Sequence, residues 1–338
     1  MIVLAGDVGG TKTDLALVSR ERGVNAPLAE ATYLSRQYAN LEMMVAEFLA
    51  CRPHRPDRVI LGVAGPVVAG RARVTNLPWV IDDVGMRRCT GAAEVCIMND
   101  LEAIAWAIPG LEAADLRQVN PGTAEAGGAV AVVAPGTGLG EALLIWDGAR
   151  YRARPSEGGH TDFGPRNERE IRLLQWLMGQ YRHASYERVC SGMAIPDLYR
   201  FVRQSGVTAH PAVAADLARA ADPTPVIVDA AMAEDNPCPA CRDALAIFAS
   251  VLGAEAGNLA LKVLATGGVY LAGGLPRRIL PLLLADDFRV AFSSKGRFSD
   301  LVGRIPVHVV LNPKAGLLGA MAQGLEDWAG APASNHTL

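Results

Sequence analysis

The sequence predicts an α/β protein built from two similar halves. Apolar runs of strand length alternate with helical patterns through the first third of the chain, which is typical of a largely parallel sheet covered by helices. A strand, a glycine turn and a second strand then occur near residue 10 and again near residue 138. The chain has 338 residues, half of them apolar, so it is long enough for two domains with sizeable cores.

In the first half, residues 1–6 and 13–18 are predicted strands, and the segment GDVGGT joins them. A helix is predicted next, because Asn40 can cap it and its apolar residues recur with helical spacing. These residues are Leu41, Met44, Val45, Phe48 and Leu49. Strands are then predicted at 58–64 and 95–98, and a helix that runs through Trp106 follows the second of them.

The second half repeats the opening pattern and then becomes more helical. The strands predicted there are 127–134, 141–146, 149–153, 269–272 and 307–311, with a glycine loop at 136–140. One helix face is predicted to carry Ile171, Leu174, Met178 and Tyr181. Residues 242–264 are almost wholly apolar, which indicates a buried helix, and the last helix follows Asn312 and Pro313.

Composition argues against several classes of protein. The net charge is −3, and no run of like charges indicates a nucleic-acid or membrane surface. Glu255, Asn258 and Lys262 interrupt the longest apolar region, so a membrane span is not expected. The N-terminal segment lacks the basic start of a signal peptide, and six scattered cysteines fit reduced thiols, so we expect a cytoplasmic protein. The C-x-x-C pair Cys238 and Cys241 has no second pair, which favours a structural or incidental role.

The stretch GDVGGTKT at residues 6–13 approaches the spelling of a P-loop, G-x-x-x-x-G-K-[ST]. Thr11 stands where the second glycine belongs, and a strand follows instead of a helix. Its glycines would still let backbone N–H groups approach a phosphate, and Asp7 is placed to orient water on a magnesium ion. An ordinary glycine hairpin is the equal alternative for this segment taken alone.

The second turn, Gly136-Thr137-Gly138-Leu139-Gly140, is not G-x-G-x-x-G, so a dinucleotide site is disfavoured. By itself such a turn is more often structural. Two similar turns in matching positions of two halves favour a pair of loops that hold one polyphosphate between them.

Two polar clusters are candidates for the chemistry. Asn99 and Asp100 follow an apolar strand, where open α/β sheets place their ligands. Asp100 is therefore a candidate general base, although capping the next helix is an equal alternative. The segment Glu157-Gly158-Gly159-His160, with Asp162 nearby, is either a solvated turn or a set of hydrogen-bonding groups for a polyol. His160 lacks a partner at metal-ligand spacing, so no protein metal site is predicted.

These features together resemble the bacterial glucokinase family, within the wider actin-like ATPase group and outside the ROK sugar kinases. The segments that carry the resemblance follow that family's order from residue 3 to about residue 320. They are LAGDVGGTKTDLAL, TNLPW, ND, APGTGLG, EGGHTDF, ERVCSG, GNLAL, GGVYLAGG and NPKAGLLGA. The resemblance implies an α/β, actin-like (ribonuclease H-like) fold of two α/β domains with a cleft between them. The expected domains are a smaller one at 1–108 plus about 308–328 and a larger one at 109–307.

The resemblance also implies ATP-dependent phosphorylation of D-glucose at its 6-hydroxyl, with Asp100 as general base. The sugar-binding residues that it implies are Asn99, Glu157, His160 and Glu187. The nucleotide-binding residues that it implies are Gly6, Asp7, Val8, Gly9, Gly10, Thr11, Gly136, Thr137, Gly138, Gly273 and Gly274. Expected partners are glucose, ATP and Mg²⁺, with no direct protein ligand set for the metal, no nucleic acid and no membrane. The expected assembly is a homodimer.

The sequence departs from this family at two places beside the expected site. Lys12-Thr13-Asp14 replaces the Asn-Ala-Arg usual after the first turn, and SGMAI replaces SGPGL after Glu187. The ROK family's cysteine-rich zinc motif is replaced by TDFGPRNE. Nucleotide affinity or sugar preference therefore stays open, and the alternatives are a kinase for mannose, fructose or glucosamine, or a non-catalytic sugar-sensing protein.

Overall fold

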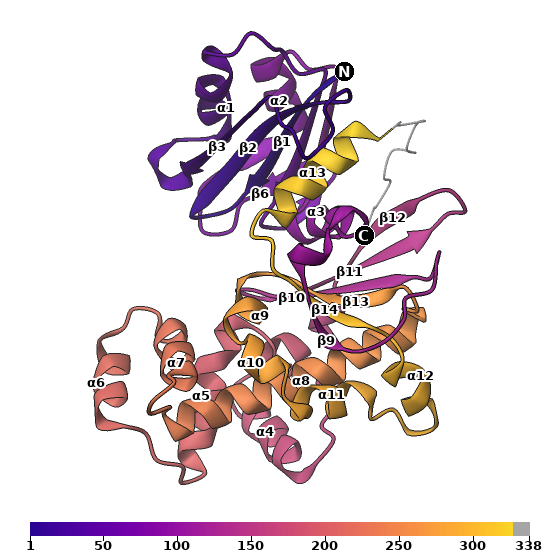
Figure 1. Ribbon diagram of the computed structural model, residues 1–338. Helices are drawn as coiled ribbons and strands as arrows, with labels where there is room; N and C mark the ends of the chain where they lie inside the picture. The colour runs from indigo at the N-terminus through magenta and orange to yellow at the C-terminus, as the bar shows by residue number, and fades with distance from the viewer. Residues whose placement is uncertain (327–338) are drawn as a thin grey trace. The chain divides into compact units, whose positions relative to one another are not determined.

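The computed structural model describes residues 1–326, which divide into two compact units (Figure 1). The first unit comprises Met1–Glu112, Arg152–Pro155 and the described part of Asn312–Leu338. The second comprises Ala113–Tyr151 and Ser156–Leu311. The boundaries lie at 112 and 311, against 108 and 307 in the sequence-based expectation, which also lacked the segment Arg152–Pro155. Residues 327 and 328 of the expected smaller domain lie outside the described residues.

The first unit has a five-stranded central sheet of order β3-β2-β1-β4-β8. Its strands are β1 (Ile2–Val8), β2 (Lys12–Ser19), β3 (Ala29–Leu34), β4 (Arg58–Val63) and β8 (Glu94–Asn99). β1 is antiparallel to β2 but parallel to β4, and β4 is parallel to β8. Val8 pairs with Val63, which pairs with Asn99, so the first glycine turn and the Asn99-Asp100 pair leave the same edge of the sheet.

Helices cover both faces of this sheet because successive side chains along β1 point to opposite sides. Leu4 packs in the cluster with α1 (Leu41–Ala50), while Val3 and Ala5 pack in the cluster with α13 (Ala315–Leu325). The predicted cap of α1 is confirmed, since the Met43 amide donates to Asn40 Oδ1 at 2.9 Å. The remaining elements of this unit are α2 (Asp83–Thr90), α3 (Asp100–Ala107) and a small sheet of β5 (Val67–Val68), β6 (Arg71–Arg73) and β7 (Val80–Asp82).

The second unit has a six-stranded sheet of order β12-β11-β10-β13-β14-β9. Its strands are β9 (Leu116–Asn120), β10 (Val130–Pro135), β11 (Leu139–Trp146), β12 (Tyr151–Ser156), β13 (Gly268–Leu271) and β14 (Val307–Val310). β10 is antiparallel to β11 and parallel to β13, as β1 is to β2 and β4. The internal repeat that the two glycine turns indicated is therefore confirmed in the strand order.

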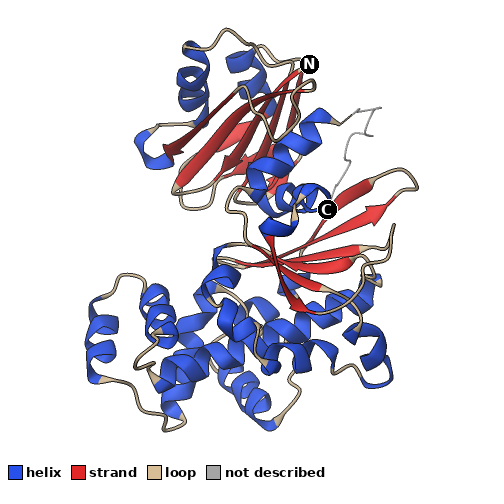
Figure 2. Cartoon of the chain, in the orientation of Figure 1, coloured by secondary structure: helices blue, strands red, loops and turns tan. Residues whose placement is uncertain are grey.

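The helices of the second unit gather on one side of its sheet (Figure 2). They are α4 (Glu168–Met178), α5 (Ile195–Gln204), α6 (Pro211–Arg219), α7 (Pro223–Met232), α8 (Pro239–Val263), α9 (Gly274–Arg278), α10 (Leu280–Leu283), α11 (Asp286–Ser293) and α12 (Ser299–Gly303). Within residues 1–326, α8 is the one helix long and apolar enough to cross a membrane by length and composition, but 78% of that stretch is buried inside the protein. The sequence-based expectation of a buried helix is therefore confirmed.

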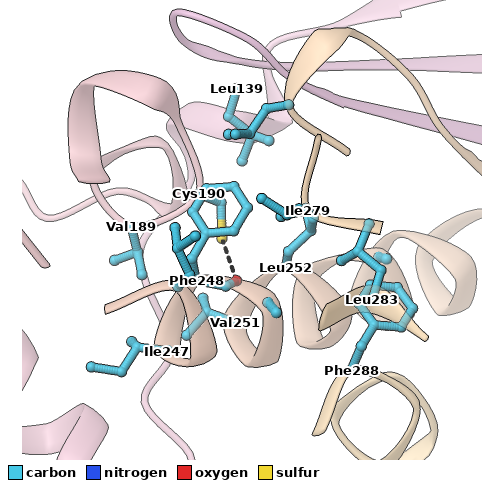
Figure 3. Close-up of a cluster of buried hydrophobic side chains, with 14 of the residues drawn as sticks. Leu139, Val189, Cys190, Ile247, Phe248, Val251, Leu252, Ile279, Leu283 and Phe288 are labelled. Atoms are coloured by element: carbon cyan, nitrogen blue, oxygen red, sulfur yellow. Dashed lines mark hydrogen bonds between the residues drawn. The ribbon is translucent and has the colours of Figure 1, made fainter. Parts of the chain in front are cut away.

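The core around α8 supports the second glycine turn. Figure 3 shows Phe248 and Leu252 of α8 below Leu139, the first residue of β11. Cys190 lies in the same cluster and is fully buried, with its thiol 4.0 Å from the Phe248 carbonyl oxygen. Both the strand after the turn and the segment that carries Cys190 are thus anchored in one apolar core.

Two local predictions for the second unit were wrong in part. The helix α4 exists, but Ile171 and Met178 of its predicted inner face are 47% and 66% exposed. The predicted Leu174 and Tyr181 do pack against the core, while Leu173 and Leu177 are buried more deeply. Glu170 is buried on the same face as Leu173 and Leu177, where it pairs with Arg166 at 2.6 Å. The glycine loop is also shorter than predicted, since β11 begins at Leu139 and Gly140 lies inside the strand.

Candidate active site

The first glycine turn consists of Gly9, Gly10 and Thr11, between the end of β1 and the start of β2. The Gly9 amide donates to the Lys12 carbonyl oxygen at 3.0 Å, which closes the turn. A Cβ on Gly10 would lie 2.5 Å from the Thr75 carbonyl oxygen, so only glycine fits against that backbone. Thr75 belongs to the TNLPW segment, which therefore packs beside the turn.

Ser35 holds the same turn from its other side. Its hydroxyl donates to the Gly9 carbonyl oxygen at 2.7 Å, and its amide donates to the Thr11 carbonyl oxygen at 3.0 Å. The side chain is fully buried. Because Ser35 hydrogen-bonds the carbonyl groups of both Gly9 and Thr11, the turn is fixed before any ligand binds.

Three of the residues predicted to bind nucleotide, Gly6, Asp7 and Val8, lie in β1 rather than in the turn. A Cβ on Gly6 would lie 2.8 Å from Leu61 Cδ2, so this glycine serves the packing of the sheet. The Val8 side chain is fully buried in the core. Asp7 lies between them on the opposite face of the strand, where a Cβ on Gly316 would be 2.6 Å from its Oδ2. The carboxyl group of Asp7 thus occupies the space that Gly316 leaves near the start of α13.

Three carboxyl groups gather beside the first turn. Burial, followed by the charges of Asp100 and Asp14, raises the pKa of Asp7 from its usual value to about 7. Lys12 acts in the opposite direction on the Asp7 pKa. The Lys12 ammonium donates to Asp14 Oδ2 at 2.8 Å, and Thr32 donates to the other Asp14 oxygen. The unusual Lys12 and Asp14 are therefore an ion pair, with Lys12 half exposed and Asp14 buried.

The sequence left open whether Asp100 caps the next helix or serves as a general base, and the structure shows that Asn99 is the cap. Asn99 is the N-cap of α3: its Oδ1 accepts from the Leu101 amide at 3.0 Å, and its Nδ2 donates to the Gly65 carbonyl oxygen at 3.1 Å. Asp100 Oδ1 also accepts from the Leu101 amide at 3.0 Å. Burial raises the pKa of Asp100, and the hydrogen bonds from Leu101 and Asn99 offset part of that shift. Asp100 is thus a fixed carboxyl group with a raised pKa, as a general base requires.

The second glycine turn consists of Gly136, Thr137 and Gly138, and the contacts that hold it differ from those of the first turn. The Gly136 amide donates to the Gly138 carbonyl oxygen at 2.9 Å. The turn's outer carbonyls accept from the segment SGMAI, since Gly192 donates to Gly136 at 2.8 Å and Met193 donates to Thr137 at 3.3 Å. A Cβ on Gly136 would meet nothing within 4 Å. This turn therefore has an open side at Gly136.

The structure brings the residues predicted to bind sugar in the second unit together. His160 Nδ1 lies 3.9 Å from Glu187 Oε1, and His160 Nε2 lies 3.9 Å from Glu157 Oε2. Glu187 is the more buried of the two carboxylates, with 16% of its side chain exposed against 90% for Glu157. Glu187 Oε2 also accepts from the Leu139 amide at 3.0 Å, so one carboxylate connects the second glycine turn with the His160 cluster. Asp162, in contrast, pairs with His183 at 2.8 Å.

The two glycines of EGGH are required by close packing against β11. A Cβ on Gly159 would lie 2.1 Å from the Leu139 carbonyl oxygen, and a Cβ on Gly158 would lie 1.9 Å from Glu141 Oε2. Glu157 and His160 are held at the two ends of this pair, around the short helix η4 (Gly158–His160). The turn is therefore pressed onto the strand that begins at the second glycine turn.

Gly273 and Gly274 follow β13 and begin α9. Gly273 has a φ of 91°, which favours glycine, and its Cβ would lie 3.3 Å from the Pro135 carbonyl oxygen. Pro135 is the last residue of β10, directly before Gly136. The glycine pair predicted to lie beside the adenosine thus packs beside the second glycine turn.

Each unit therefore assembles its own group of predicted residues. The first unit holds Asp7, Gly9, Gly10, Thr11, Asn99 and Asp100 at one edge of its sheet, and the second holds Gly136, Thr137, Gly138, Glu157, His160, Glu187, Gly273 and Gly274. Sequence reasoning missed Ser35, Thr75 and the buried pair Glu141 and Glu255. For Glu141 a signal existed, namely a carboxylate inside an apolar strand directly after GTGLG.

Comparison with known proteins places this arrangement in one family. The family model described as Glucokinase matches residues 4–326. The glucokinase of Synechocystis sp. is 40% identical over 340 residues, which cover 94% of this chain and 96% of that protein. The glucokinase of Nostoc punctiforme is 37% identical over 335 residues, which cover 94% of this chain and 97% of that protein.

A solved structure supports the same assignment. The crystal structure of glucokinase from an Antarctic psychrotroph superposes with a TM-score of 0.80 at 30% sequence identity, and covers 95% of this chain and 98% of that chain. Together with the repeated strand order, this match confirms the expected actin-like ATPase fold of two α/β units.

Proposed function

We propose that this chain, which belongs to the glucokinase family, transfers the terminal phosphoryl group of ATP to the 6-hydroxyl of D-glucose, with Asp100 as the general base. The observation that carries this proposal is the Glu157–His160–Glu187 cluster, which one hydrogen bond from Leu139 ties to a glycine turn suited to phosphate. A sugar kinase needs a sugar site and a phosphate site that are held in a fixed position relative to each other.

Asp100 supplies the base. Its carboxylate accepts the proton of the sugar 6-hydroxyl as that oxygen attacks the γ-phosphorus, and the bond from the γ-phosphorus to the ADP oxygen breaks. The pKa of Asp100 is raised by burial, so its anion is more basic than an exposed aspartate, while the Leu101 amide keeps the carboxylate in place. The Asn99 amide donates to the Gly65 carbonyl oxygen and to the Asp100 carboxyl group, and on the family resemblance we place it beside the sugar.

The sugar hydroxyls are bound by Glu157, His160 and Glu187. Carboxylate oxygens accept from hydroxyl groups, and the imidazole donates or accepts at either nitrogen. The separations of 3.9 Å on both sides of His160 exceed a hydrogen bond, so these side chains keep polar capacity for a polyol. A site built in this way discriminates against analogues that lack a hydroxyl, because the largely buried Glu187 carboxylate would lose a partner.

The nucleotide phosphates are held by the backbone amides of Gly10 and Thr11 and of Thr137 and Gly138, because the Gly9 and Gly136 amides donate within their own turns. Gly273 and Gly274 lie beside the adenosine. Mg²⁺ fits the first turn, because Asp7 offers a hard oxygen ligand in a group of carboxyls whose mutual repulsion a divalent cation relieves. Within residues 1–326, no three His, Cys, Asp or Glu side chains gather as a metal-ligand group, so the nucleotide and water complete the coordination. The ion, when bound, neutralises phosphate charge. On the family resemblance we also propose a cytoplasmic homodimer.

A coupled assay of ADP release over a panel of sugars tests the proposal. We expect turnover with ATP and glucose, and lower kcat/KM for mannose, fructose and glucosamine. A higher kcat/KM for another hexose would reassign the substrate. No ADP release with any hexose would contradict the proposed kinase activity and favour a sugar-sensing protein.

A further inference from the structure

A buried glutamate lies directly behind the sugar-binding turn. Glu141 follows the second glycine turn on β11, and only 1% of it is exposed. Neither of its carboxyl oxygens has a hydrogen-bond partner among residues 1–326. Burying a carboxyl group without a hydrogen-bond partner destabilises the folded state, and the cost is larger for the charged form than for the neutral form.

The Glu141 carboxyl group reaches the backbone of the turn. A Cβ on Gly158 would be 1.9 Å from Glu141 Oε2, so the group fills the space that the missing side chain leaves. The Gly158 amide donates instead to the Ser156 hydroxyl oxygen at 3.0 Å. Packing against Glu141 therefore sets the distance between β11 and the backbone of the turn at Gly158. Gly158 lies between Glu157 and His160, the two residues of the turn that are predicted to bind sugar.

A second buried glutamate faces the first. Glu255 of α8 is fully buried, and its two oxygens accept from Asn258 at 2.8 Å and from Lys262 at 3.5 Å. The Glu255 charge acts on Glu141 and raises its pKa. The titratable or charged groups around this pair are Lys262, Lys295, Tyr186, Cys190 and Arg166.

We propose that Glu141 is a positioning residue for the sugar site, whose buried carboxyl group supports Gly158 from its place between the EGGH turn and Glu255. The inference rests on the proposed function, since it assigns Glu157 and His160 to sugar binding. Glu141 does not touch the sugar; it fixes the backbone from which the two side chains project.

The ionisation of Glu141 gives this support a pH limit. Burial, followed by the Glu255 charge, raises the pKa of Glu141 to about 7, while Lys262 acts in the opposite direction. A carboxyl group with a raised pKa in the folded state favours that state at low pH, and this contribution is lost as the pH rises through 7. Above pH 7 two buried carboxylates face each other beneath the turn, and their repulsion displaces it.

The test measures the Kd for glucose by calorimetry, and the KM values for glucose and ATP, between pH 5.5 and 8.5. In the unmodified protein the Kd for glucose should rise above about pH 7. Glu141→Gln keeps the shape without the charge, so its glucose affinity should stay at the low-pH value throughout. Glu141→Ala removes the support and should weaken glucose binding roughly 10- to 100-fold at every pH.

Leu143→Ala is the matched control, because Leu143 lies on the same face of β11, two residues further from the turn, and packs against the same core. It should lower the melting temperature and leave glucose affinity unchanged. An unmodified protein that neither binds nor phosphorylates glucose would overturn the proposed function and this inference together. An active protein whose Glu141→Gln variant keeps the pH dependence, or whose Glu141→Ala variant binds glucose normally, would overturn this inference alone.

Discussion

The two units share one strand order, yet they surround their glycine turns differently. In the first unit, Gly10 is locked against the Thr75 backbone, and the carboxyl groups of Asp7, Asp14 and Asp100 gather beside the turn. In the second unit, Gly136 has open space, and the carboxyl groups of Glu187 and Glu141 lie behind the turn.

The carboxyl groups therefore have different effects in the two units. The carboxyls of the first unit influence one another's ionisation next to a rigid turn, which suits proton transfer and metal-bound phosphate. The carboxyls of the second unit connect the turn to the sugar-binding cluster, so they set positions. With the roles proposed above, the first unit supplies the chemistry and the second unit supplies the recognition of the sugar.

The largest expected effect is that of Asp100→Asn in the first unit. Loss of the general base should lower kcat by about 10²- to 10⁴-fold and leave the Kd for glucose near its original value. The asparagine keeps the hydrogen bond from the Leu101 amide, so the fold near α3 is preserved. Steady-state kinetics and calorimetry check the two halves of this prediction. A variant with near-normal kcat would remove Asp100 from the role of base.

His160→Ala tests the recognition of the sugar by the second unit. Removing the imidazole between Glu157 and Glu187 should raise the KM for glucose roughly 10- to 100-fold, the cost of one or two hydrogen bonds to a charged site. The KM for ATP should change far less. Equal effects on both substrates, measured in the same coupled assay, would undercut the separation of recognition from chemistry.

A pair of glycine substitutions compares the two turns directly. Gly10→Ala places a methyl group 2.5 Å from a carbonyl oxygen and should destabilise the protein by about 1–3 kcal/mol. Gly136→Ala has open space and should change stability by less than about 0.5 kcal/mol, while raising the KM for ATP because phosphate no longer approaches the backbone. Thermal melts and ATP kinetics distinguish the two. An unchanged KM for ATP in Gly136→Ala would show that this turn does not cradle the phosphates.

The smallest effect is expected for Lys12→Met, which bears on the charge beside the first turn. Lys12 is the one neighbour that lowers the Asp7 pKa among the interactions described, so its loss should raise that pKa further above about 7. Asp7 would then stay protonated to higher pH, and the acid limb of kcat/KM for MgATP should move upward. The profile of Lys12→Arg serves as the control, since it keeps the charge. An unmoved limb would make Lys12 a bystander.

Local patterns predicted much of this architecture. The strands on both sides of each glycine turn and the cap at Asn40 follow from short-range rules, and the structure confirms them. The inner face of α4 was predicted only in part, since Leu174 and Tyr181 pack against the core but Ile171 and Met178 are exposed. Glu170 is buried and paired with Arg166, and apolar periodicity does not reveal such a contact.

The site was predictable only where a motif marked it. Glu187, His160 and Asp100 were identified from family-like segments, and their roles stay proposals. Ser35 begins a short 3-10 helix and Thr75 lies in the TNLPW segment, and only the folded chain brings them to the first turn. Glu255 sits in the middle of a helix whose sequence indicates burial, so its pairing with Glu141 depends on a long-range packing that spacing along the chain does not reveal.

The most direct test of the central claim is the identity of the product. The protein is incubated with MgATP and glucose, and the phosphorylated sugar is examined by ³¹P and ¹H nuclear magnetic resonance. We predict one new phosphate monoester whose phosphorus couples to the two protons on carbon 6, formed in step with ADP. A phosphate on any other carbon, or ATP consumed without a sugar phosphate, would contradict the account.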